Sequence, residues 1–184
     1  MKRIGILGGI GSGKSYVAKS FGYPVFNADK EVSNLYKKNK KIFYKLKKVL
    51  PKYFKKFPIE KHDISRAILD KDLNLKKIIR IVHFEIRKKM KIFLKKNKNR
   101  KFIILDIPLL LENKINKKND ILIFVHSKKH EVLRRLKKRK NFSEKLFRKF
   151  SNIQLSLDYK KKNHNLWLKM ILQKKQYQNM LKIF

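Results

Sequence analysis

The chain has 184 residues, a length typical of one domain that can bury a substantial core. Its apolar fraction of 42% is too high for a disordered chain, and the absence of cysteine excludes disulfides, thiolate metal sites and thiol catalysis. The formal charge of +38 would suit a polyanionic ligand, but the basic residues are spread from Lys2 to Lys182 without forming a block. We interpret the charge as a lysine-rich solvated surface. No segment approaches the roughly 20 apolar residues that span a bilayer, so we expect a cytoplasmic protein with no membrane partner.

The start of the chain has backbone requirements that the rest lacks, because five of the six glycines lie within the first thirteen residues. A short apolar run precedes these glycines, and a helical pattern follows them. Pro24 then excludes further helix. The expected elements are a strand at 3–7, a loop at 8–13, a helix at 14–21 capped by Gly22, and a brief strand at 25–26.

The middle of the chain is predicted to be helical from about 30 to 99, with breaks at Pro51 and Pro58. Two continuous apolar runs follow, at 102–105 and 121–125, and such runs are typical of strands covered on both faces in a parallel sheet. The remainder, 128–184, is expected to be helical, with breaks near Asn141 and His164. The pattern predicts an α/β sandwich with a helical insertion.

Residues Gly8 to Ser15 satisfy the pattern G-x-x-x-x-G-K-[ST] at every position, between a predicted strand and a predicted helix. Glycines in such a loop let backbone N–H groups turn inward around a phosphate. Lys14 would reach the β- and γ-phosphates of a nucleoside triphosphate, and the Ser15 hydroxyl would ligate Mg²⁺. The alternative is a glycine-rich strand-to-helix turn that binds nothing.

The loop motif does not by itself separate kinase, GTPase and motor. A guanine-reading motif resembling N-K-x-D is absent, because the pairs Asn113-Lys114 and Asn116-Lys117 are not followed by Asp at the required place. A large ATPase would need arms or further domains, for which this chain has no room. The length favours a small-molecule kinase.

Two acidic residues stand at the ends of predicted strands: Asp29 after residues 25–26, and Asp106 after residues 102–105. Ligands of doubly wound sheets lie at the carboxyl ends of the strands, so both acids should border the phosphate loop. A carboxylate there could accept a proton from an attacking hydroxyl or hold the water shell of a metal. Asp29 could also be the N-cap of a helix that starts at Lys30, and the two roles are compatible.

These residues resemble the dephospho-coenzyme A kinase family. The family pattern G-x-x-G-G-I-G-S-G-K-S is matched by Gly5 to Ser15, and P-V-x-D-A-D is similar to Pro24 to Asp29. The family pattern D-x-P-L-L-F-E is closely matched by Asp106 to Glu112. The family's R-x-x-x-R and later Gln are met by the three residues Arg135, Arg139 and Gln154.

The resemblance implies a P-loop NTPase fold of the adenylate-kinase type, with a three-layer α/β/α arrangement around a parallel sheet. One kinase domain would comprise a core at about 1–29 and 100–134 plus a C-terminal helix, a helical substrate-binding insertion at about 30–99, and a lid at about 135–160. It would use ATP and Mg²⁺ to phosphorylate the ribose 3′-hydroxyl of dephospho-coenzyme A (dephospho-CoA), giving CoA and ADP in the last step of coenzyme A biosynthesis. We expect a monomer with no obligate nucleic acid partner.

The resemblance also assigns the site residues. Asp29 matches the general base, while Lys14 and Arg139 would stabilise the transferring phosphoryl group. Arg135 and Arg139 are four residues apart, which is also typical of a solvated helix face. The ATP site would comprise Gly11, Ser12, Gly13, Lys14, Ser15, Tyr16, Arg135 and Arg139; the acceptor site Asp29, His83, Asp106, Pro108 and Leu109; and the metal ligand would be Ser15.

The chain departs from the family pattern at several places. Asn27 replaces a frequent Asp, Tyr16 replaces the usual Thr, and His83 is followed by Phe84 rather than Pro. The family's late A-D-x-x-I-x-N stretch is not legible after Lys160. Two other functions stay open at this point: a nucleoside or nucleotide kinase, and a nucleic-acid-binding protein that uses ATP as a switch.

Overall fold

The computed structural model describes residues 1–139 and 142–169, and the chain divides into two compact units. The core unit contains Met1–Asn27, Asn97–Ser143 and the residues from Phe150 on. The insertion unit contains Ala28–Lys96 and Glu144–Lys149. The expected C-terminal helix would fall within 170–184, outside the described residues.

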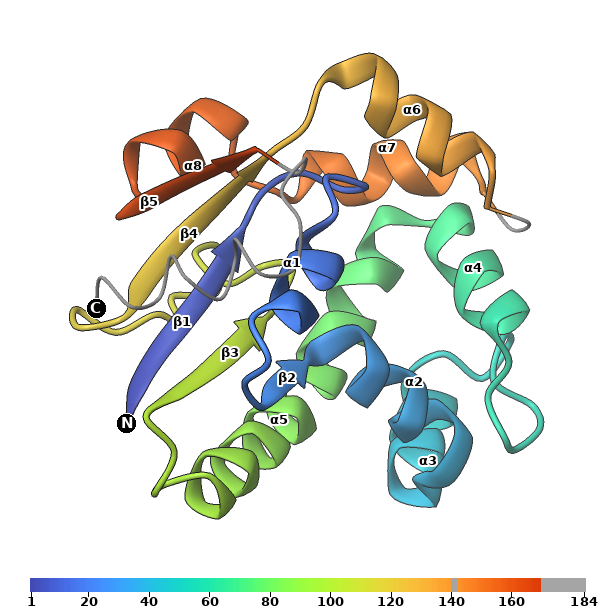
Figure 1. Cartoon of the computed structure of the whole chain (residues 1–184). Coiled ribbons are helices and arrows are strands. Elements are labelled where there is room, and N and C mark those ends of the chain that lie inside the picture. Colours follow the sequence, from blue (N-terminus) through green and yellow to red (C-terminus); the bar gives the residue numbers. More distant parts are fainter. Residues whose placement is uncertain (140–141, 170–184) are drawn as a thin grey trace. The chain divides into compact units, whose positions relative to one another are not determined.

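The core unit is built on a five-stranded sheet in the order β2-β3-β1-β4-β5, in which every neighbouring pair is parallel (Figure 1). This sheet confirms the α/β class predicted from the apolar runs. In parallel strands of this kind the carboxyl ends share one edge, where ligands bind. The strands are β1 (Lys2–Leu7), β2 (Val25–Asn27), β3 (Phe102–Asp106), β4 (Ile121–His126) and β5 (Leu166–Lys169).

One face of the sheet is covered by helix α1 (Lys14–Ser20). Its buried side chains Val17 and Ala18 join Ile4 and Ile6 of β1 in the main apolar cluster. β3 is buried along its whole length, as expected of a central strand in a parallel sheet. Gly22 follows α1 with φ of +76°, so the predicted glycine cap is confirmed.

The carboxyl-terminal part of the core unit differs from the sequence-based prediction. The prediction of helix after residue 128 is confirmed for α6 (Lys129–Lys137) and α8 (Leu157–Lys162). Leu166–Lys169, however, forms the edge strand β5, so the prediction of continuous helix beyond His164 is wrong. The strand is specified by pairing with β4, in the register Ile123↔Leu166 and Val125↔Leu168, rather than by its local sequence.

The insertion unit is helical, as predicted between the second and third strands. Apolar side chains at helical spacing form its interior, among them Leu35, Ile42, Leu46, Ile68 and Val82. α7 is a single helix that begins in the insertion unit and ends in the core unit. The helices are α2 (Ala28–Lys38), α3 (Lys40–Val49), α4 (Lys61–Asp70), α5 (Asp72–Lys96) and the first six residues of α7 (Glu144–Asn152).

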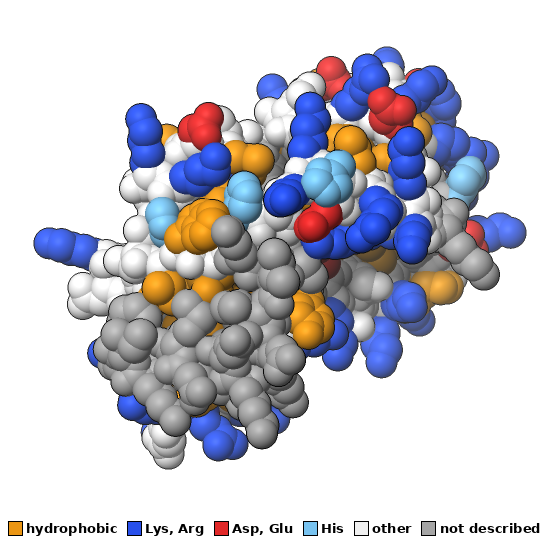
Figure 2. All heavy atoms as spheres, turned by 45° about the horizontal axis from the view of Figure 1, so that its top comes forward, with side chains coloured by type: hydrophobic (Ala, Val, Ile, Leu, Met, Phe, Trp, Pro, Cys, Tyr) orange, Lys and Arg blue, Asp and Glu red, His pale blue; other side chains and the backbone are white. Residues whose placement is uncertain are grey.

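The basic residues are scattered over the surface. Figure 2 shows a face on which Lys and Arg side chains lie among apolar and polar ones, with few acidic side chains between them. None of the helices in the described part of the chain is long and apolar enough to cross a membrane.

Candidate functional site

The phosphate loop joins β1 to α1 in a conformation that requires glycine. Gly8, Gly11 and Gly13 have φ of +144°, +77° and +96°, which side-chain-bearing residues rarely adopt. A Cβ atom on Gly8 would also lie 2.7 Å from both Ser12 Oγ and the carbonyl oxygen of Val125. The glycine pattern of the sequence therefore corresponds to a physical requirement of this loop.

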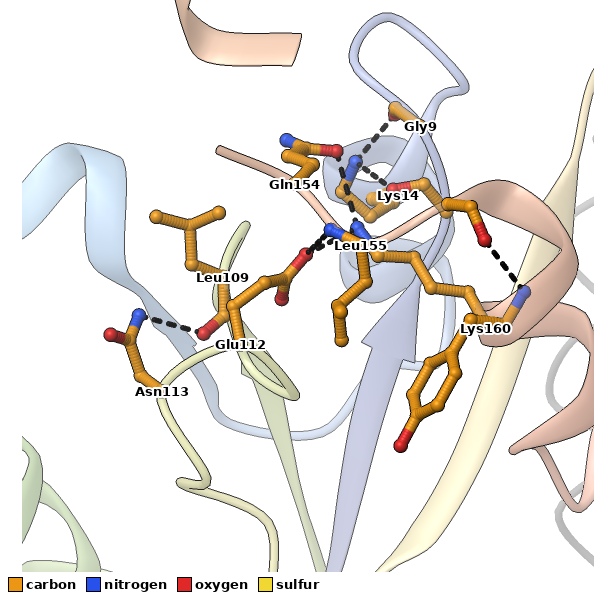
Figure 3. A network of polar contacts seen from close by, with 11 residues as sticks. Gly9, Lys14, Leu109, Glu112, Asn113, Gln154, Leu155 and Lys160 are labelled. Carbon is orange, nitrogen blue, oxygen red and sulfur yellow. Dashed lines mark hydrogen bonds and ion pairs between the residues drawn. The ribbon is translucent and has the colours of Figure 1, made fainter. Parts of the chain in front are cut away.

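Lys14, the first residue of α1, folds back over the loop (Figure 3). Its Nζ donates hydrogen bonds to the carbonyl oxygens of Gly8 at 3.0 Å and Gly9 at 2.6 Å, and the side chain is buried. Ser12 Oγ is buried and has no hydrogen-bond partner in the described structure. A buried ammonium and an unsatisfied buried hydroxyl on the same short segment are well suited to receive phosphate oxygens.

The next two residues, Ser15 and Tyr16 in the first turn of α1, face outward. Ser15 is exposed, and Tyr16 is 53% exposed. A hydroxyl oxygen is a hard ligand of the kind that Mg²⁺ prefers, and Mg²⁺ is usually held by one or two protein groups together with substrate phosphates. No group of three or more His, Cys, Asp or Glu residues that could hold a metal occurs within 1–139 and 142–169. The Ser15 hydroxyl therefore has the chemistry of a Mg²⁺ ligand.

Helix α6 braces the tip of the loop. Arg135 Nη1 donates to the carbonyl oxygen of Gly11 at 3.4 Å and to Ser127 Oγ at 3.3 Å, while its Nη2 pairs with Glu131 at 2.9 Å. Ser127 Oγ in turn donates to the carbonyl oxygen of Ser12 at 2.8 Å. The structure therefore brings Arg135 to the loop. It also brings there two residues that the sequence analysis did not predict, Ser127 and Glu131. Ser127 could have been found, since it directly follows β4 at the ligand-binding edge.

The packing between α6 and the loop is tight. A Cβ atom on Gly11 would lie 3.0 Å from Val132 Cγ1 and from Leu136 Cγ. Arg139 lies in the turn after α6, where its side chain is exposed. Of the two predicted arginines, Arg135 contacts the loop and Arg139 faces solvent.

The predicted acid at the end of β3 is in place. Asp106 is 3% exposed and accepts a hydrogen bond from Asn27 Nδ2, in agreement with the β2–β3 register that pairs these residues. Asn27 is therefore a donor to Asp106, whereas an Asp at this position would place two carboxylates together. Pro108 and Leu109 lie in the turn that follows β3, and the carbonyl oxygen of Leu109 accepts from Asn113 Nδ2 at 2.8 Å.

Asp29 and His83 belong to the insertion unit. α2 begins at Ala28, so Asp29 lies inside the first helical turn, and the N-cap alternative for a helix starting at Lys30 is wrong. The Asp29 side chain is exposed, two residues beyond the end of β2.

His83 is partly buried in α5, and burial, followed by the charge of Arg87, lowers the pKa of its imidazole. His83 is thus held in the neutral form near neutral pH.

Glu112, the last residue of the motif Asp106 to Glu112, forms a buried ion pair with Lys160 (Figure 3). Lys160 Nζ lies 2.8 Å from Glu112 Oε1, with side chains 2% and 10% exposed. The same oxygen accepts from the backbone N–H of Leu155 at 3.0 Å, and Lys160 also donates to Gln154 Oε1 at 3.2 Å. The pair therefore fixes the segment that leads into α8, whose Leu157 side chain packs beside Gly9.

Comparison with known proteins identifies the family. The dephospho-CoA kinase family model matches residues 2–173. A dephospho-CoA kinase of Wolbachia sp. subsp. Brugia malayi (strain TRS) is 37% identical over 163 residues, which cover 86% of this chain and 83% of that protein.

Two solved structures share the fold. TT1252 from Thermus thermophilus matches with a TM-score of 0.75 at 24% identity, covering 99% of this chain and 95% of that one. A dephospho-CoA kinase from Campylobacter jejuni matches with a TM-score of 0.61 at 19% identity and the same coverage. Together with the family model and the Wolbachia relative, the motif-bearing loop and sheet lead to one conclusion: this chain belongs to the dephospho-CoA kinase family, as its motifs predicted.

Proposed function

We propose that this chain transfers the γ-phosphoryl group of ATP to the ribose 3′-hydroxyl of dephospho-CoA, giving CoA and ADP. Family membership supports the acceptor, and the phosphate loop supports the donor. The observation that carries the proposal is the loop itself. Three glycines with positive φ, a buried Lys14 ammonium and an unsatisfied Ser12 hydroxyl form a site for phosphate oxygens.

In the proposed reaction, the 3′-oxygen forms a bond to the γ-phosphorus while the bond from that phosphorus to the bridging β-oxygen breaks. The hydroxyl proton passes to the Asp29 carboxylate, and ADP leaves with the electron pair. Asp29 is supported as the base by its place in the chain. β2, β3 and β1 are adjacent and parallel, so β2 ends at the same edge as the phosphate loop, and Asp29 follows two residues later.

Charge on the transferring group would be neutralised by the basic residues of the loop region. Lys14 would exchange its two carbonyl partners for phosphate oxygens. Arg135 already contacts the loop, and we assign Arg139 to the same task once ATP is bound. Gly11, Ser12, Gly13 and Tyr16 would complete the ATP site. The Ser15 hydroxyl would hold Mg²⁺, which supplies positive charge to the phosphates when it is bound.

We assign the acceptor to the residues at the ends of β2 and β3 and to the insertion. Asp106, Pro108 and Leu109 follow or end β3, and the neutral imidazole of His83 can donate or accept a hydrogen bond. On this proposal a monomer suffices, and no nucleic acid is needed.

An acceptor panel tests the proposal. The purified protein is incubated with ATP, Mg²⁺ and either dephospho-CoA, a set of nucleosides and nucleotides, or single-stranded and duplex DNA, and ADP release and product mass are recorded. We expect rapid ADP release with dephospho-CoA alone and a product that is heavier by one phosphoryl group. Faster transfer to a nucleoside, or ADP release that requires nucleic acid, would replace the proposal with the corresponding alternative.

A further inference from the structure

Lys149, on helix α7, holds the junction between two helices of the insertion unit. Its Nζ donates to the carbonyl oxygens of Ile68 at 2.9 Å and Leu69 at 3.4 Å, and it lies 2.6 Å from Asp72 Oδ1. Ile68 and Leu69 lie in the last turn of α4, and Asp72 is the first residue of α5. One ammonium group therefore joins α7, α4 and α5.

The contact satisfies a specific electrostatic need. The last carbonyl groups of a helix lack partners within the helix and carry partial negative charge, so a cation nearby is stabilising. α4 has no basic residue in its own last turn, and Lys149 supplies the missing cation. The hydrogen bond from Lys149, followed by its charge, lowers the pKa of Asp72. The neighbouring Arg148 side chain is 74% exposed, whereas that of Lys149 is only 25% exposed.

The same stretch of chain is fixed at its other end in the core unit. Three residues beyond the end of α7, the backbone N–H of Leu155 donates to Glu112, and Gln154 accepts from Lys160. Residues 144–149 belong to the insertion unit, and the residues from 150 on belong to the core unit. The short segment 149–155 thus has one polar anchor in each unit.

We infer that Lys149 is a positioning residue for phosphoryl transfer. It attaches α7 to the junction of α4 and α5, so residues 149–155, which lead toward the phosphate loop, are ordered only when the insertion unit is ordered. The inference rests on the proposed function, in which the insertion takes part in binding the acceptor. Without the contacts of Lys149 with α4 and α5, which we call the clamp, the acceptor can still bind to the insertion unit, but its binding no longer orders residues 149–155. Acceptor affinity and the preference for transfer over hydrolysis of ATP should then fall together.

Lys149→Met removes the ammonium and keeps the aliphatic stem, and Lys145→Met is the matched control, since Lys145 is an exposed lysine on the same helix. We expect Lys149→Met to raise KM for dephospho-CoA about tenfold, the scale of a lost charged hydrogen bond, with little change in KM for ATP. The ratio of ATP hydrolysis to transfer should rise. Lys149→Arg, which keeps a cation at the carbonyl groups, should recover most of the loss.

Hydrogen exchange supplies a readout that does not depend on the acceptor. Backbone amides of α7 should lose protection in Lys149→Met and keep it in Lys145→Met. The inference is overturned if the two variants match in exchange and kinetics, or if Lys149→Met lowers only thermal stability. If the wild-type protein fails to phosphorylate dephospho-CoA while α7 still loses protection in Lys149→Met, the proposed function is wrong and the clamp is retained as a structural feature only.

Discussion

The buried pair of Glu112 and Lys160 allows a quantitative prediction. Lys160→Met would leave the Glu112 carboxylate, 10% exposed, without its counter-charge, and Glu112→Gln would leave the Lys160 ammonium, 2% exposed, without its own. Breaking one side of such a pair costs about 3–5 kcal/mol of unfolding free energy, because an uncompensated charge stays buried. Gln at position 112 still offers an oxygen to the Leu155 N–H.

The double variant Glu112→Gln/Lys160→Met buries no charge. It should therefore cost only about 1–2 kcal/mol, far less than the sum of the single variants. The free energy of unfolding of the wild type, the two single variants and the double variant is measured by urea unfolding, followed by the fluorescence of Trp167, the single tryptophan. Lys161→Met, at a side chain that is 42% exposed, is the control and should change stability by no more than about 0.5 kcal/mol. Costs of the single variants that equal the control, or that simply add in the double variant, would refute this reasoning.

Three further predictions concern the loop and the insertion. Lys14→Met should lower kcat by about a thousandfold or more with the fold retained by circular dichroism, and activity within tenfold of wild type would contradict its role. Gly8→Ala should cost at least about 2 kcal/mol in urea unfolding because of its φ of +144° and the contact with the Val125 carbonyl oxygen, while Gly9→Ala, which meets only the flexible Leu157 side chain, should cost clearly less. Since burial lowers the folded-state pKa of His83, the unfolded chain binds more protons as pH falls below about 6.5, so wild-type stability should decrease there. His83→Gln should flatten that pH dependence, and an unchanged slope would count against it.

The parts of the fold that the sequence predicted are those with local causes. The glycines at 8, 11 and 13 are needed for their own backbone angles, and the continuous apolar runs reflect burial on both faces, so β1, β3 and β4 follow from the pattern. β5 does not. Its four residues form a strand by pairing with the edge of β4, and so short a segment has too few residues to show a periodic pattern.

The site was predictable to a similar extent. Sequence reasoning expected Lys14 and Asp106 at one edge of the sheet, because parallel strands end at the same edge, and β1 and β3 are adjacent and parallel. The hydrogen bond from Ser127 to Ser12 joins residues 115 positions apart, and the pair of Glu112 and Lys160 joins distant segments in the same way. Such contacts depend on the packed tertiary structure, so spacing in the sequence could not have revealed them.

In the proposed function, the phosphate loop and the carboxylate of Asp29 serve a single transfer reaction. The most direct test compares Asp29→Asn with Glu31→Gln, which removes one negative charge from the same helix. For each protein, kcat with dephospho-CoA and the Kd for ATP are measured. We expect Asp29→Asn to lower kcat by about 10²–10⁴-fold and to leave the Kd for ATP within about threefold of wild type, while Glu31→Gln changes neither by as much. A kcat close to wild type in Asp29→Asn would contradict it.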